Sequence, residues 1–185
     1  MRKALYIIVV STLSLSAIQA QGVSGQGDKA APTAQIQRGR ELFTNAKKGV
    51  ACKTCHQLGG VGTAIAPDLT NMASNGSVHS IVMTMHMTMT EHVYRVRTAV
   101  SSFPGILKAK YGDKTEYYDL SQIPPVVRTL LSREIVSTER DEKWHHPPAL
   151  ADYDSQELAD VIAFLKFAAT GSQHEIAVGD INPNW

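Results

Sequence analysis

The sequence has few cysteines and almost no net charge. Its 185 residues include only two cysteines, and the formal net charge is +1. A zinc knuckle needs a second pair of cysteines or histidines at matching spacing, and the chain has no further cysteine. A near-neutral charge gives no reason to expect binding to nucleic acid or to an anionic membrane surface. After residue 20, no stretch is apolar enough to cross a bilayer.

The first 20 residues have the features of a secretory signal peptide. Arg2 and Lys3 form a positive start, residues 4–18 are mostly apolar, and the segment closes on small residues ending at Ala20. The apolar stretch is shorter than the roughly 20 residues of a spanning helix, so cleavage after Ala20 is favoured over a membrane anchor. Losing the two positive charges changes the formal charge from +1 to −1. The mature protein is therefore expected to be periplasmic or secreted.

The remaining chain is long enough for one domain with one core. Residues 21–32 are rich in small and polar side chains and are expected to form a flexible leader. A single domain is predicted over residues 33–171, with residues 77–143 as an insertion within it. Residues 172–185 are then a C-terminal tail.

Cys52 and Cys55 are separated by two residues, and His56 follows directly. This C-x-x-C-H motif attaches haem: each thiol adds to one vinyl group, and the histidine imidazole binds the iron. Two cysteines in an exported protein would otherwise suggest a disulfide. A thioredoxin-like C-x-x-C pair would need a βαβ context, which the flanking sequence does not provide. The motif predicts one covalently attached haem c.

Helices are predicted on both sides of the motif. Residues 34–45 place Ile36, Gly39 and Phe43 on one face. A glycine inside a helix costs about 1 kcal/mol relative to alanine, so Gly39 is expected to mark close packing. A second helix is predicted between a cap at Asp154 and a stop at Gly171. Its apolar stripe consists of Leu158, Val161, Ile162 and Leu165.

These features together resemble the class I c-type cytochromes, a family of monohaem proteins. The shared pattern is the helix with Gly39 and Phe43, the motif at 52–56, the segment Ala66-Pro67-Asp68-Leu69 and the terminal helix at 158–165. The resemblance covers residues 34–76 and 144–170. It implies an all-α fold in which the terminal helices cross beside the haem. It also implies that the Pro67 carbonyl orients the His56 ring and that Leu69 packs against the porphyrin.

The second axial ligand of the iron stays open at this point. Family members usually supply a methionine shortly before the last helix, but this chain has no methionine after Met89. The sequence there reads Trp144-His145-His146-Pro147-Pro148. Imidazole binds haem iron strongly, and His146 is favoured over His145 because it directly precedes the prolines. The alternatives are a methionine from the middle region, or iron with an open position; the candidate methionines are Met72, Met83, Met85, Met87 and Met89.

The insertion at 77–143 is too long to be a plain loop. A turn at 112–114 between residues 106–111 and 115–120 is compatible with a small β-hairpin, and a short helix is expected beside it. Residues 137–143 are charged and expected to be solvated. The methionines between 83 and 89 could bind Cu(I), but packing into a core is favoured because flexible methionines commonly fill one.

These features predict an electron carrier rather than an enzyme, since no catalytic constellation is found. It would shuttle single electrons outside the cytoplasm. The expected partner is an extracytoplasmic redox protein, and relatives with an inserted segment suggest a quinoprotein dehydrogenase. No nucleic acid partner is expected, and no integral membrane segment after signal cleavage. The alternative is a haem-based sensor or a small haem enzyme, which requires an open distal position.

Overall fold

The computed structural model describes residues 31–47, 49–86, 92–146 and 153–181. The predicted signal peptide and most of the predicted leader lie outside the described residues. In chain order the helices and strands are α1 (Ala34–Thr44), η1 (Cys52–Thr54), β1 (Gln57–Leu58), β2 (Val61–Gly62), α2 (Thr70–Asn75), α3 (Val78–His86), β3 (Tyr94–Thr98), β4 (Ser102–Tyr111), β5 (Lys114–Asp119), β6 (Val126–Leu131), η2 (Ser132–Glu134), β7 (Ile135–Arg140), α4 (Ser155–Thr170) and η4 (Val178–Asp180).

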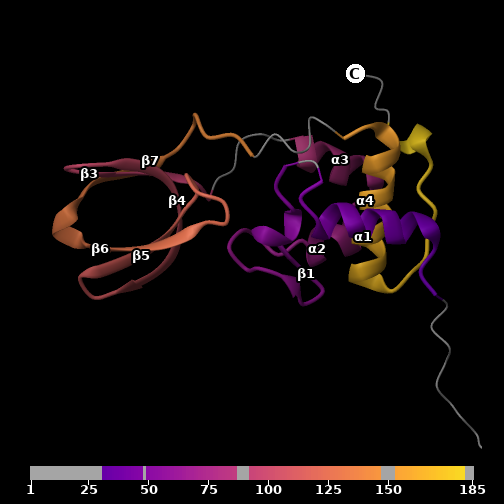
Figure 1. Cartoon of the computed structure of the whole chain (residues 1–185), viewed down its shortest axis with the longest axis horizontal. Coiled ribbons are helices and arrows are strands. Elements are labelled where there is room, and N and C mark those ends of the chain that lie inside the picture. Colours follow the sequence, from indigo (N-terminus) through magenta and orange to yellow (C-terminus); the bar gives the residue numbers. More distant parts are fainter. Residues whose placement is uncertain (1–30, 48, 87–91, 147–152, 182–185) are drawn as a thin grey trace, which may run out of the picture. The chain divides into compact units, whose positions relative to one another are not determined.

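Helices α1 and α4 cross in close contact (Figure 1). At the crossing, a Cβ added to Gly39 would lie 1.8 Å from the carbonyl oxygen of Asp160 and 2.9 Å from Cβ of Phe164. Only glycine permits this approach, which explains why the residue stands inside a helix despite its cost. Both predicted helices, and the close packing predicted at Gly39, are confirmed.

Helix α4 is capped as its sequence predicts. Asp154 Oδ1 accepts a hydrogen bond of 2.8 Å from the Glu157 backbone N–H, and Glu157 Oε2 accepts one of 3.0 Å from the Asp154 N–H. This reciprocal arrangement satisfies two amides that the helix itself leaves without partners. At the other end, Gly171 has a φ of +74°, and its N–H donates to the Phe167 carbonyl. The helix therefore ends where the glycine was expected to end it.

The main core lies between α1, α4 and the short helices α2 and α3. Phe43, Ile81 and Ile162 are fully buried in it. Arg38 pairs with the buried carboxylate of Asp160 through two hydrogen bonds, at 2.6 and 2.8 Å. The segment after α4 lies beside the start of α1. The Gln35 side-chain amide donates to the Ile176 carbonyl at 2.9 Å and accepts from the Ile176 N–H at 3.0 Å.

Residues 94–140 contain a five-stranded antiparallel sheet in the order β6-β5-β4-β3-β7. Strands β3 to β6 form a meander, and β7 returns to pair with β3. Strands β4 and β5 form the predicted hairpin, with Gly112 in the turn at a φ of +59°. The all-α prediction is wrong, because residues 94–140 are mostly strand.

The sheet has a small core of its own. Val96, Phe103 and Tyr117 are buried within it. Arg128 lies 4.6 Å from the Phe103 ring centroid and pairs at 2.7 Å with the fully buried carboxylate of Asp119. A buried carboxylate is costly without such a partner. The short helix expected beside the hairpin is not found here: residues 126–131 form the edge strand β6, as their β-branched valines and threonine favour.

Among the residues that the structure describes, no helix is both long and apolar enough to span a bilayer.

Candidate functional site

The C-x-x-C-H segment is held by a loop that folds back over it. Cys52 begins the 3₁₀ turn η1, and the His56 N–H donates to the Cys52 carbonyl at 2.9 Å. The Ala66 N–H donates to the Cys55 carbonyl at 2.8 Å, and the Leu69 N–H donates to the Gln57 carbonyl at 2.8 Å. Residues 57–69 therefore form a backbone brace that fixes the direction of the His56 side chain.

Gly62 makes this brace possible. Its φ is +101°, a backbone conformation that residues with a side chain rarely adopt. A Cβ at this position would also lie 2.2 Å from the His56 carbonyl oxygen. Gly62 is not among the site residues predicted from the sequence. Its signal is the run of glycines at positions 59, 60 and 62, immediately after the motif.

The two thiols are half-buried and do not form a disulfide. Burial raises the pKa of the Cys52 thiol to about 11 and also raises the pKa of the Cys55 thiol. Redox-active C-x-x-C pairs depend on a thiol whose pKa is lowered well below its usual value. The environment here has the opposite effect, which disfavours a thioredoxin-like activity for this pair.

His56 is held in one tautomer. Its Nδ1 lies 2.8 Å from the carbonyl oxygen of Pro67. A carbonyl can only accept, so Nδ1 carries the hydrogen in this contact and Nε2 keeps its lone pair. Burial lowers the pKa of the imidazole despite the opposing effect of the Pro67 carbonyl, which favours the neutral form that binds metals. The Pro67 carbonyl therefore fixes the orientation and the tautomer of the His56 ring.

His146 faces His56. The ring centroids are 6.0 Å apart, and the ring planes are inclined by 28°. Two imidazole nitrogens bound to one metal ion each lie about 2 Å from it, which puts the ring centroids on opposite sides about 6 Å apart. The two histidines, 90 residues apart in sequence, therefore have the separation that one shared metal ion requires. Together with two free thiols beside His56, these residues fit a covalently attached haem.

The other distal-ligand candidates are placed less favourably. His145 is exposed, whereas His146 is half-buried. Met72 and Met85 are half-buried and pack against the helical core, and Met83 is 36% exposed on α3. Met87 and Met89 lie outside the described residues. The packing of Met85 agrees with the core role favoured for this methionine run over copper binding.

Leu69 and Trp144 complete the surroundings of the two histidines. Leu69 is half-buried at the start of α2 and packs against the helical core. The Trp144 ring meets the His146 ring edge-on, with centroids 6.3 Å apart and an interplanar angle of 76°. Trp144 is not among the site residues predicted from the sequence. An aromatic residue two positions before a candidate ligand was the available signal.

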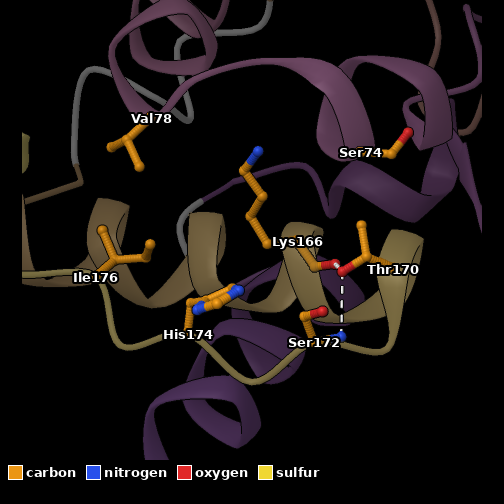
Figure 2. Close-up of a pocket in the computed structure, with 7 residues that line it drawn as sticks. All are labelled: Ser74, Val78, Lys166, Thr170, Ser172, His174 and Ile176. Atoms are coloured by element: carbon orange, nitrogen blue, oxygen red, sulfur yellow. Dashed lines mark hydrogen bonds between the residues drawn. The ribbon is translucent and has the colours of Figure 1, made fainter.

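A pocket of about 310 Å³ lies elsewhere in the helical part, between α4, the start of α3 and the segment after α4 (Figure 2). Lys166 points into it, and its ammonium donates to the Gly76 carbonyl. The Ser172 N–H donates to Thr170 Oγ1 at 3.1 Å. These polar groups already serve the local fold, and neither the thiols nor His56 or His146 line the pocket. We assign it no ligand.

Comparison with known families agrees with this geometry. The family model described as "Cytochrome c" matches residues 36–99, from α1 through the attachment motif to the end of β3. This match supports a c-type cytochrome domain in this part of the chain, and members of the family bind covalently attached haem c. Cytochromes of this family are generally electron carriers. No curated protein matches the chain.

Proposed function

We propose that this protein is an extracytoplasmic electron carrier whose haem iron is bound by His56 on one side and by His146 on the other. The 6.0 Å separation of the two imidazole rings is the observation that carries this proposal. Haem supplies one-electron chemistry at its iron. Cys52 and Cys55 would attach it, the Pro67 carbonyl keeps the Nε2 lone pair of His56 available, and Leu69 would pack against the porphyrin.

Two histidine ligands favour a carrier over a sensor or a small haem enzyme. Those alternatives need an open or displaceable distal position. The His146 ring lies 6.0 Å from the His56 ring, so with both bound to the iron a small molecule would have to displace an imidazole to bind there. A pair of strong protein ligands leaves electron exchange as the function that the site supports best.

His146→Ala tests this assignment. We expect the purified holoprotein to lose its low-spin six-coordinate absorption spectrum, because the alanine cannot donate to iron. His146→Met should introduce the weak red absorption band of sulfur bound to ferric haem. It should also raise the reduction potential by on the order of 0.1 V, since methionine ligation favours the reduced state.

His145→Ala is the matched control, because this exposed neighbour shares the backbone segment but not the contact with His56. Its spectrum and potential should equal those of the unchanged protein. An unchanged low-spin spectrum in His146→Ala would disprove the assignment. A sulfur band in the unchanged protein would point to a methionine instead.

We further propose that the sheet carries the docking surface for the redox partner, for which a quinoprotein dehydrogenase is the donor we favour. Ten large apolar side chains are exposed among the described residues, and seven of them lie in the sheet part of the chain. These are Val100, Leu107, Tyr111, Ile123, Val126, Val127 and Val136. With a formal charge close to zero, docking by apolar contact is more effective than long-range steering.

Replacing Leu107 and Tyr111 together with serine tests this surface. The second-order rate of reduction by a purified quinoprotein dehydrogenase and its substrate should fall roughly thirtyfold, because two apolar interface contacts at about 1 kcal/mol each sum to about 2 kcal/mol. Reduction by ascorbate should be unchanged. Val178→Ser, which alters an equally apolar exposed residue outside the sheet, should leave both rates unchanged. Equal enzymatic rates in all three proteins would refute the docking proposal.

A further inference from the structure

The two ends of the sheet, where the chain enters and leaves it, are joined by hydrogen bonds and an ion pair. Strands β3 and β7 pair in antiparallel fashion, with Tyr94 opposite Arg140. One step further out, the Asp141 N–H donates to the Val93 carbonyl at 2.9 Å. The Asp141 carboxylate is only 3% exposed and pairs with Arg95 Nη2 at 2.5 Å. We call residues 93–95 and 140–141 the neck of the sheet.

The neck also fixes the segment that follows it. The Lys143 N–H donates to Asp141 Oδ1 at 3.2 Å, and the Trp144 N–H donates to the Asp141 carbonyl at 3.2 Å. An aspartate that binds the backbone two residues further on forms a defined turn. Asp141 therefore sets the backbone of residues 141–144 through its carbonyl and its carboxylate, and the same carboxylate pairs with Arg95.

Trp144 extends this fixed segment to the distal imidazole. Its ring is half-buried and lies edge-on to His146 at 6.3 Å, in one of the arrangements that aromatic rings prefer. The His146 ring in turn faces His56 at 6.0 Å. A continuous series of contacts thus runs from the ion pair of Arg95 and Asp141 through Trp144 to the ring opposite His56.

We propose that Trp144, supported by the ion pair of Arg95 and Asp141, is a positioning residue that fixes the orientation of the His146 imidazole; this inference rests on the proposed role of His146 as distal ligand. Residues that orient a metal ligand without touching the metal tune its binding and its electronics. Through the ion pair of Arg95 with Asp141, the sheet thereby helps to orient His146 without itself contacting the haem.

Trp144→Ala and Arg95→Gln are the test, with Trp144→Phe as the conservative variant and His145→Ala as the control. Two properties of the oxidised holoprotein are measured: the rate of cyanide binding and the electron paramagnetic resonance spectrum. Cyanide must displace the distal ligand, and the g-values of low-spin haem report the relative orientation of the two imidazole planes. A general loss of stability would not by itself change the g-values of the folded protein.

We expect Trp144→Ala and Arg95→Gln to bind cyanide about tenfold faster and to show shifted g-values, because the imidazole is no longer held in one orientation. Trp144→Phe, which keeps an aromatic edge, should stay close to the unchanged protein, as should His145→Ala. Rates within twofold and identical g-values in Trp144→Ala would overturn the inference. If His146→Ala in the same series keeps its low-spin spectrum, the ligand assignment itself fails, and that result differs from failure of the positioning role alone.

Discussion

A protein in which both Cys52 and Cys55 are replaced by alanine is expected to release all of its haem when it is denatured in acidified acetone. The unchanged protein should retain its haem under the same treatment. The thioethers are the only covalent links that the C-x-x-C-H motif provides, and the bond from His56 to iron does not survive acid because the imidazole becomes protonated. Absorbance of the extracted and retained fractions, with the mass of the denatured chain, measures the difference.

Single replacements refine this prediction. Cys52→Ala and Cys55→Ala should each retain haem through one thioether, in lower yield, with a shifted absorption spectrum. Lys53→Ala is the matched control, because this exposed residue lies between the cysteines and should leave haem retention complete. Stable haem retention after denaturation of the double variant would contradict covalent attachment at these two positions.

The second large effect is expected from Gly39→Ala. The new Cβ would lie 1.8 Å from the backbone oxygen of Asp160, so α1 and α4 must move apart. The contact at that point is backbone, which cannot rotate away as a side chain can. We expect the free energy of unfolding of the holoprotein to fall by about 3 kcal/mol, at the upper end of the cost of overpacking a core.

Gly179→Ala provides the control for this change. Nothing lies within 4 Å of a Cβ added there, and its φ is not positive, so its stability should match that of the unchanged protein. Urea unfolding followed by circular dichroism gives both values. Equal midpoints for the two variants would mean that the helices are not packed as closely as described.

The helices and the attachment motif could be predicted because their signals are local. Helix α4 is predicted by an apolar stripe of helical period between a capping aspartate and a terminal glycine, all within 18 residues. The haem motif occupies five consecutive residues. The position of Gly39 even indicated which face of α1 would meet its partner, since only close packing justifies a glycine there.

The sheet was missed beyond its hairpin because short strands carry weak local signals. Residues 126–131 are mostly apolar, and the periodicity of such a short segment does not show whether it is a strand or a helix. In residues 135–140, the chain alternates but is mostly exposed, which resembles a solvated charged segment. What makes both into strands is pairing, of β6 with the preceding strand β5 and of β7 with the distant strand β3, and no local pattern specifies either pairing.

The distal side of the site shows the same limit. His146 could be chosen from its place before two prolines, but its distance from His56 depends on the path of the chain through the whole insertion. The pairing of Arg95 with Asp141 joins residues 46 positions apart, and neither residue attracts attention in the sequence. Contacts of this kind depend on tertiary structure, which no local pattern specifies.

The meeting of the sheet's two ends at its neck has a consequence for how such a protein could arise and be altered. A unit that leaves the chain and returns to the same point can be exchanged as a cassette, because its host needs only two adjacent attachment points. The exchangeable part ends at Asp141, five residues before His146 and far in sequence from the thioether cysteines. Swapping cassettes would therefore change the support of His146, the proposed distal ligand, while leaving haem attachment as it was.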